Sequence, residues 1–516
     1  MPADDGGSFS PPTRFERVLS VEGIGVGLAA VILVAGTWLV SVPGMSAESQ
    51  TVLTVFGVAL ALWLSKAVPY TISSVLVVTL LFALGAVDSF ETAVGGFAST
   101  LVFFLFLLLL LGQTISSVGL DERAAQRLLS AQSTPKRTVR SLGANIFALS
   151  FLMPSAVARA VTFIPVVRRL TETYGLAEDS DFTRASYLVL GHVNPIASMA
   201  LMTGGGMAII TSQVINADVR TITWVEWAIV MIPPVIVLYG LSTLAAVRIY
   251  DVDDTVTIDD KAATDGGDPT AENEGKTADD VADDPSADDP PTDGPVDDLA
   301  ESVVDGTSEP LTRDQRIVGG VMGATVIAWI LGSFLGVPTI VPAIGAVTAL
   351  SLPGVRIITA DDVADVSWGI LFLIGAMFSI LDVMETSGTL TLLVETITVY
   401  IPFAAMAPWQ VVATLLVIAA VLRSFFSTAS AAIIIVLPIV LEFAAFLGVN
   451  QLFLAFSVLI MVGSTTFLPF NTTSVLLSFD YGPLSNRDVL AFGLVTMVFG
   501  SVVIVASWLF YWPLVL

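Results

Sequence analysis

Residues 142–167 read LGANIFALSFLMPSAVARAVTFIPVV, an apolar stretch that is interrupted near its middle at Met153-Pro154-Ser155. Basic residues flank the stretch on both sides: Lys136, Arg137 and Arg140 precede it, and Arg168, Arg169 and Arg184 follow it. Short loops rich in Lys and Arg stay on the cytoplasmic side of a membrane. We therefore predict a re-entrant hairpin that enters and leaves the membrane from the cytoplasmic side.

A second apolar stretch, 409–440, is interrupted in the same way around Ser427-Thr428-Ala429-Ser430. It ends in Pro438, as the first stretch ends in Pro165. Arg423 is the only Lys or Arg from 357 to 486, so the loops on both sides of this stretch are expected to be external. One hairpin opening from inside and one from outside is the pattern of an inverted-topology repeat, in which binding sites lie near the membrane midplane.

The composition agrees with a membrane protein of many helices, because 55% of the residues are hydrophobic and only 13% are charged. A helix needs about 20 apolar residues to cross a bilayer. Such stretches recur along the chain, and runs such as 101–112 (LVFFLFLLLLLG) lack the alternation of a membrane β-barrel. We predict an all-α membrane protein with eleven transmembrane helices and two opposed re-entrant hairpins.

The predicted organisation follows from these spans and from the basic loops. Residues 1–21 form a cytoplasmic N-terminus, 22–97 the scaffold helices 1–3, and 98–249 the first repeat; 250–312 form a linker, 313–367 further scaffold helices, and 368–516 the second repeat. The N-terminus and the linker are expected in the cytoplasm and the C-terminus outside. Arg220, in a short external loop, is the basic residue that disagrees with this topology.

The linker carries most of the net charge of -25. Residues 251–310 hold 21 Asp and Glu against two Lys, which gives -19 for this segment alone. Acidic, rich in Pro and Gly and without aromatic residues, it cannot bury enough surface to order itself and is predicted to be a disordered spacer. A regulatory or partner-binding tail is the alternative. The density of carboxylates resembles the surfaces of proteins from extreme halophiles.

Each interruption of a helix is a candidate binding site, because unwound backbone persists in lipid only where it is buried in protein or lines a cavity. A helix start presents free N–H groups to an anion, and hydroxyls with free carbonyls suit a small hard cation. Ser155, Thr428 and Ser430 stand at such positions. The alternative is that these hydroxyls only form hydrogen bonds within their own helices.

Two arginines lie within the interrupted stretches, where a charge is costly and usually faces a cavity or a partner. Arg159 follows Ser155 by one helical turn and is the better candidate to attract an anion; Arg423 precedes Thr428. Replacing Arg159 with Gln is then expected to abolish anion uptake. The alternatives are that the side chains reach the membrane surface, or pair with a buried acid such as Asp382, Glu385 or Glu442.

Other functions are less well supported. The single histidine, His192, lies beside Asn194-Pro195 and could couple protons, although a structural role is favoured. Lys66 is interpreted as an anchor at the membrane surface. The chain has no cysteine, no HExxH and no Gly-x-Ser-x-Gly, so an enzyme is not expected. Two hairpins that stop midway favour alternating access over a continuous channel.

Several short segments, taken in their order, resemble one transporter family. Residues 63–69 (WLSKAVP) resemble its Trp-Leu-Thr-Glu-Ala-Ile-Pro, with Lys66 in place of Glu. Further segments that are similar to the family are Gly96-Phe97-Ala98, Trp368-Gly369-Ile370-Leu371 and Glu385-Thr386-Ser387-Gly388. The chain thus resembles the divalent anion:sodium symporter family.

That family carries a Ser-Asn-Thr triplet at each hairpin tip, ten residues before a proline. Here the two positions read Ser155-Ala156-Val157 and Thr428-Ala429-Ser430, so both asparagines are replaced by alanine. The family's Leu-Pro-x-x-Thr is present as residues 468–472, and its Gly/Thr-rich loop is matched loosely at Thr203-Gly204. The resemblance implies a substrate site and a sodium site. The substrate residues would be Ser155, Arg159, Thr428, Ser430 and Thr472; the sodium residues would be Ser155, Thr203, Gly204, Thr428, Ser430 and Thr472.

The resemblance also implies a function. We expect a secondary transporter in the plasma membrane that moves a di- or tricarboxylate or sulfate with sodium, by an elevator-type motion in a homodimer. The expected partners are the small anion, membrane lipid and a second copy, and no nucleic acid. Loss of both asparagine amides puts the sodium coupling and the dicarboxylate specificity in doubt. The alternative is a carrier of the same fold that is coupled to protons or acts as an exchanger or efflux pump.

Overall fold

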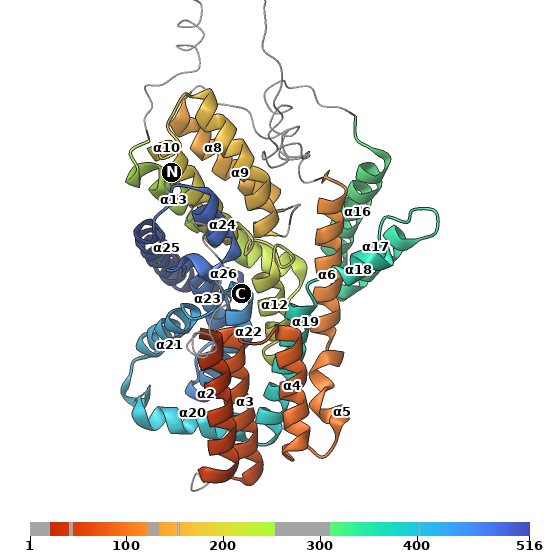
Figure 1. The fold of residues 1–516 in the computed structure, drawn as a ribbon, viewed down its shortest axis with the longest axis vertical. Helices are drawn as coiled ribbons and strands as arrows, with labels where there is room; N and C mark the ends of the chain where they lie inside the picture. Colours follow the sequence, from red (N-terminus) through yellow and green to blue (C-terminus); the bar gives the residue numbers. More distant parts are fainter. Residues whose placement is uncertain are drawn as a thin grey trace, which may run out of the picture. The chain divides into compact units, whose positions relative to one another are not determined.

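The computed structural model describes residues 21–40, 45–120, 123, 134–151, 153, 155–252, 310–401 and 403–516. The predicted cytoplasmic N-terminus, Pro154 and most of the predicted acidic linker lie outside these residues. Within them, every regular element is a helix, as Figure 1 shows. The prediction of an all-helical protein is therefore confirmed for the part of the chain that is described.

Among the described residues, seven helices are long and apolar enough to cross a membrane. They are α3 (Ala47–Ser65), α6 (Thr100–Ser117), α13 (Trp224–Ile249), α16 (Arg313–Leu335), α19 (Trp368–Thr386), α22 (Ala429–Leu447) and the continuous Asn486–Val515. The shorter apolar helices span Gly23–Leu39, Tyr70–Ala83 (α4), Ile340–Ser351 (α17), Pro408–Arg423 (α21) and Gln451–Ser464 (α23). The chain is thus a multi-pass membrane protein, and the count of eleven spans stays a prediction.

The remaining elements are short or interrupt longer helices. Near the N-terminus they are α2 (Val21–Val34), η1 (Ala35–Leu39), α5 (Phe90–Ala93) and η2 (Gly95–Ala98). The first repeat adds α8 (Pro135–Leu149), α9 (Ala156–Thr173), α10 (Asp181–Leu188), η3 (Val189–Val193), α11 (Asn194–Ala197) and α12 (Gly206–Asp218). The second half adds α18 (Ala360–Ala364), α20 (Thr389–Tyr400), η4 (Phe403–Ala405), η5 (Pro469–Asn471), α24 (Thr473–Tyr481), α25 (Asn486–Ala506), η6 (Ser507–Tyr511) and α26 (Trp512–Val515).

Both predicted interruptions separate two helices. The first lies between α8 and α9, and the second between α21 and α22. The helices extend beyond the predicted stretches, to 135–173 and 408–447, and continue through Pro165 and Pro438 instead of ending there. The prediction failed at these ends for two reasons: an amphipathic helix carries basic residues on its outer face, and membrane helices tolerate an internal proline. Whether the two hairpins re-enter the membrane stays a prediction.

The chain divides into two compact units. Unit 1 consists of Met1–Gln113, Gly206–Trp227 and Ala324–Val462, and unit 2 of Thr114–Gly205, Ala228–Gly323 and Gly463–Leu516. Unit 1 holds the α21–α22 hairpin, and unit 2 holds the α8–α9 hairpin. Each unit therefore contains one of the two interrupted stretches that the sequence singles out.

In unit 1, α19 packs closely against α4 and η2. The closest approach is at Gly96, whose N–H donates to Ser379 Oγ at 3.1 Å. A Cβ on Gly96 would lie 2.3 Å from Gly375 O, so only glycine allows this packing. The α12 helix packs against α22 of the hairpin. The hairpin of unit 1 is thereby joined to a helix from the first half of the chain.

In unit 2, α24 packs against α9 and η3. The Tyr239 hydroxyl of α13 donates to Gly143 O of α8 at 2.8 Å. Thr138 and Tyr174, at the two open ends of the α8–α9 hairpin, approach to 2.5 Å between their side-chain oxygens. A side-chain contact therefore joins the two arms of the hairpin far from its turn, and the hairpin packs against helices from both halves of the chain.

Candidate functional site

Three of the predicted site residues are the N-caps of helices. Ser155 Oγ accepts the N–H of Ala158 at 3.1 Å at the start of α9. Thr428 Oγ1 accepts from the third helical residue of α22 at 3.2 Å, and Thr472 Oγ1 does the same in α24 at 3.2 Å. The hydroxyls thus bind within their own helices, as the alternative interpretation expected. They also fix three helix starts, whose remaining N–H groups suit an anion.

In unit 1, two helix starts lie side by side. Ser430, in the first turn of α22, faces Gly206, the first residue of α12. A Cβ on Gly206 would lie 2.6 Å from Ser430 Oγ, so glycine is what lets the two helix starts approach. The two positive helix ends consequently point into one region of unit 1.

In unit 2, α9 and α24 pack against each other. Arg168 Nη2, late in α9, lies 3.4 Å from the carbonyl oxygen of Tyr481, the last residue of α24. The turn that holds Thr203 and Gly204 is compact, because Gly204 N donates to Leu201 O at 3.0 Å. A Cβ on Gly204 would lie 2.6 Å from Ser198 O, so this turn also requires glycine.

The seven predicted residues divide between the two units. Ser155, Arg159, Thr203, Gly204 and Thr472 belong to unit 2, and Thr428 and Ser430 belong to unit 1. Each unit contains a hairpin start together with the start of a helix from the other half of the chain.

Arg159 is fully buried and donates to four oxygen atoms of unit 2. Its Nε lies 2.7 Å from Asn194 Oδ1, and its Nη2 lies 2.7 Å from Ser198 Oγ and 3.3 Å from Asn194 O. Its Nη1 donates to Met153 O, in the turn of the hairpin. The guanidinium therefore joins the hairpin turn to the interrupted helix η3–α11.

Arg423 joins its hairpin turn to a neighbouring helix in unit 1. It lies in the first arm of its hairpin, α21, whereas Arg159 lies in the second arm of the other hairpin, α9. It is fully buried; its Nη1 lies 2.8 Å from Phe426 O, and its Nε lies 3.3 Å from Val462 O of α23. Phe426 precedes the N-cap Thr428 by two residues, as Met153 precedes the N-cap Ser155. Both arginines thus place a guanidinium at the corresponding point of their hairpin, although they occupy different positions in the repeat.

Both arginines are fully buried in the protein, which does not match a side chain that reaches the membrane surface. The ion pairs found among the described residues are Arg184–Asp488 and Arg220–Glu226, so Arg159 does not match the pairing with a buried acid. Direct contact of Arg159 with a substrate stays a prediction. Its partners Asn194 and Ser198 were not predicted from the sequence, where the Asn194-Pro195 pair inside an apolar helix was the available signal.

His192 lies in η3, a π-helical turn of the interrupted helix. Its Nε2 is 3.2 Å from Val489 O of α25, and its ring meets Phe492 edge-on with centroids 5.3 Å apart. Its buried Nδ1 has no partner among the described residues. These contacts fit the favoured structural role, in which the ring ties the interrupted helix to α25.

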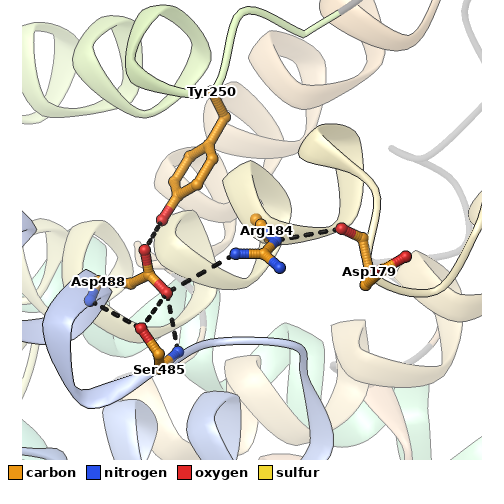
Figure 2. Close-up of polar contacts among 5 residues, drawn as sticks. All are labelled: Asp179, Arg184, Tyr250, Ser485 and Asp488. Atoms are coloured by element: carbon orange, nitrogen blue, oxygen red, sulfur yellow. Dashed lines mark hydrogen bonds and ion pairs between the residues drawn. The ribbon is translucent and has the colours of Figure 1, made fainter.

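A polar cluster holds the ends of three helices of unit 2 together, as Figure 2 shows. Asp488 accepts from the Tyr250 hydroxyl and from Ser485 Oγ at 2.6 Å, and it pairs with Arg184 at 3.9 Å. Arg184 Nε also donates to Asp179 O at 3.1 Å. Burial, together with the bond to Asp488, raises the pKa of Tyr250. The cluster ties α10, α13 and α25 together and needs no ligand.

The oxygens around the two guanidinium groups are of the kind that sodium prefers. Met153 O, Asn194 Oδ1 and Ser198 Oγ, however, already accept from Arg159. A sodium ion among these oxygens would stand beside a fixed, desolvated positive charge, which is strongly unfavourable. The residues at this place therefore do not fit sodium, and the same argument holds for Phe426 O and Val462 O beside Arg423.

Each of the two hairpins thus has a buried arginine at its turn and a helix start beside it. The model of the sodium:sulfate symporter transmembrane region matches residues 25–516. The chain belongs to this family. The predicted resemblance to divalent anion:sodium symporters is thereby confirmed, and the family consists of carriers, which confirms that the chain is not an enzyme.

Individual relatives of the family are distant. The L-tartrate/succinate antiporter of Shigella flexneri is 24% identical over 450 residues, which cover 83% of this chain and 82% of the relative. The antiporter of the same name from Escherichia coli K12 is 23% identical over the same shares. A membrane protein of Cupriavidus necator is 24% identical over 243 residues, and the chain matches 47% of its length.

Proposed function

We propose that the chain is a secondary transporter that exchanges small dicarboxylate anions across the membrane without sodium. The observation that carries this proposal is the pair of buried guanidinium groups, Arg159 and Arg423, which make corresponding contacts at the two hairpin turns. Each one supplies a permanent positive charge near a helix start. This was the alternative function in the sequence analysis.

The charges give a physical reason for exchange. A buried cation is costly in a membrane, and an anion bound near it would offset that cost. The loaded carrier would then rearrange more easily than the empty one, because the empty one retains a buried positive charge without this compensation. In a carrier of this kind, the binding site returns to the first side of the membrane only when it holds another anion. This behaviour is obligate exchange. Sodium would not be needed, because the protein supplies its own positive charge.

The N-capped helix starts provide the binding groups. The N–H groups at the start of α9 and α24 in unit 2, and of α12 and α22 in unit 1, would donate to carboxylates. Ser155, Thr428, Ser430 and Thr472 remain the proposed substrate residues, and the arginines position the hairpin turns. We further propose that alternating access occurs by an elevator-type motion in a homodimer, as the family resemblance implies.

The relatives suggest the substrate class. The antiporters that align with 83% of this chain are named for L-tartrate and succinate, both four-carbon dicarboxylates. We propose a substrate of this class, with sulfate as the smaller dianion that the family description names.

Counterflow in proteoliposomes tests the proposal. Purified protein is reconstituted, and uptake of labelled succinate is measured with or without succinate inside, in sodium or in choline buffer. Exchange predicts rapid uptake only when the vesicles contain a dicarboxylate, with equal rates in the two buffers. Accumulation into empty vesicles that requires sodium would overturn the proposal.

Sodium symport, our first expectation from the sequence, is the second candidate, and the family description favours it. The variants Arg159→Ser and Arg423→Ser separate the two functions. If the guanidinium groups replace a coupling ion, each variant loses exchange in choline, and millimolar sodium restores part of it. Lys66→Ser, which removes a cation outside the hairpins, serves as the control and keeps sodium-independent exchange.

A further inference from the structure

Two grooves run along α13 in unit 2, and neither takes part in the proposed transport site. The α25 groove, of about 590 Å³, lies between α13 and α25, and the α8 groove, of about 540 Å³, lies between α13 and α8. Leu244 of α13 lines both, so the two grooves are neighbours. Ile236 in the α8 groove is 50% exposed, and Val498 in the α25 groove is 53% exposed. The grooves are therefore open along their length.

Each groove is apolar except for one arginine. In the α25 groove, every lining residue other than Arg248 is apolar. The α8 groove contains the hydroxyls of Tyr239 and Thr243, but both already donate to backbone carbonyls, at 2.8 Å and 2.9 Å. Its charged residue is Arg140. Neither guanidinium forms an ion pair or a side-chain hydrogen bond within the described part of the chain, so both can bind a ligand.

The two arginines lie toward the same end of unit 2. The rings of Phe147 and Tyr239 are 5.0 Å apart, and a Cβ on Gly143 would lie 2.9 Å from Thr243 Cγ2. The α8 and α13 helices are therefore antiparallel, and the start of α8, with its arginine, lies toward the end of α13, where the other arginine stands. The polar cluster of Figure 2 holds the start of α25 beside the same end.

The predicted topology puts this end of unit 2 at the cytoplasmic surface, because Lys136 and Arg137 also lie there. Basic pockets between helices on that side bind the headgroups of anionic lipids. Along α13 the lining extends over 12 residues, from Arg248 to Ile236, which is about 18 Å of helix. One leaflet contributes about 15 Å to the hydrocarbon core. The grooves thus have the length of an acyl chain.

We propose that the two grooves bind an anionic phospholipid of the cytoplasmic leaflet. Its acyl chains lie in the grooves on the two sides of Leu244, and its phosphate accepts from Arg140 and Arg248. A free anion would use the arginines but leave the apolar walls without a partner, whereas a phospholipid uses both. The site is separate from both hairpin turns and does not depend on the exchange mechanism.

Photolabelling of the full chain tests the proposal. The protein is placed in phosphatidylcholine nanodiscs that contain a trace of phosphatidylglycerol with a diazirine in one acyl chain, and mass spectrometry locates the labelled residues. Labels are expected on the groove residues of α13 and α25, and unlabelled phosphatidylglycerol should remove them, whereas glycerol phosphate should not. No label in the grooves, equal labelling by a phosphatidylcholine probe, or competition by glycerol phosphate would overturn the proposal.

Charge variants test the arginines. Arg140→Gln and Arg248→Gln should each lower groove labelling by trace phosphatidylglycerol about fivefold, because each removes one cation from the phosphate. Arg316→Gln, which removes an exposed arginine of α16 outside the grooves, serves as the control and should label as the parent does. If both groove variants retain the labelling of the parent, the phosphate is not bound there and the proposal is wrong.

A steric variant tests the acyl chain. Gly240 lines the α8 groove, and a Cβ there would meet nothing within 4 Å, so leucine fits the fold but occupies the groove. Gly240→Leu should remove most of the labelling in the α8 groove. Gly320→Leu on α16, where a Cβ also meets nothing, is the matched control. Size-exclusion chromatography establishes that both variants fold, and full labelling of folded Gly240→Leu would contradict the proposed position of the chain.

Discussion

Replacing Arg159 with methionine should destabilise the protein far more than the same change at Arg168, an exposed arginine of the same helix. Methionine keeps most of the aliphatic volume but removes every donor. Asn194 Oδ1, Ser198 Oγ and Met153 O would then be left without the guanidinium inside unit 2. We expect the substitution to weaken the connection between the hairpin turn and the interrupted helix most.

The magnitude follows from four hydrogen bonds with a charged donor. At about 1.5 kcal/mol each they contribute about 6 kcal/mol. Part of this is offset because methionine avoids the desolvation of a guanidinium, so the expected net loss is about 3–5 kcal/mol. For units of this size, such a loss corresponds to a fall in Tm on the order of 10 °C. Arg168→Met loses one 3.4 Å contact to Tyr481 O and a cation–π contact, together about 1 kcal/mol.

The assay is thermal unfolding of purified protein in detergent, followed by tryptophan fluorescence, with both variants and the parent measured side by side. Arg159→Lys gives a further comparison, because lysine keeps the charge but cannot make the forked contacts, and it should fall between the parent and methionine. Equal midpoints for Arg159→Met and Arg168→Met would refute the reasoning that the buried guanidinium holds the hairpin in place.

Two further predictions concern packing and the polar cluster. Gly96→Ala should strongly reduce the yield of folded protein in size-exclusion chromatography, because its Cβ would lie 2.3 Å from Gly375 O; Gly95→Ala, whose Cβ meets nothing within 4 Å, should behave as the parent. Tyr250→Phe removes the hydroxyl that donates to Asp488 and should lower the thermal stability by about 1–2 kcal/mol at neutral pH, whereas an unchanged midpoint would show that the bond contributes little.

The sequence was sufficient to predict the membrane class and the two interruptions. Apolar runs of about 20 residues have no other stable place than a bilayer, and Ser155 and Thr428 are residues that start helices. The helices around the interruptions are longer than the predicted stretches, because the basic residues of α8 lie on a continuing helix and because Pro165 and Pro438 do not end theirs. The start of the second stretch, at 409, agrees with the start of α21 to within one residue. Local residue type does not tell whether a helix continues through such a position.

The arginines show where the sequence was not sufficient. The depth of Arg159 and Arg423 in the membrane was apparent from their apolar neighbours, which led to three interpretations: an anion site, the membrane surface or a buried acid. Their actual acceptors are backbone carbonyls, one amide and one hydroxyl. A backbone carbonyl has no signature in the sequence, so these partners could not be recognised there.

By itself, therefore, the sequence determined that the chain crosses a membrane repeatedly, where its helices break, and which family it resembles, because hydrophobicity and helix-capping chemistry act locally. Only the tertiary structure decided which residues the ends of the interrupted helices contact. Gly206 approaches Ser430, and Arg159 reaches Asn194, through the packing of segments that are distant in the chain. Such contacts depend on how helices pack in three dimensions, which is not encoded in the identity of any single segment.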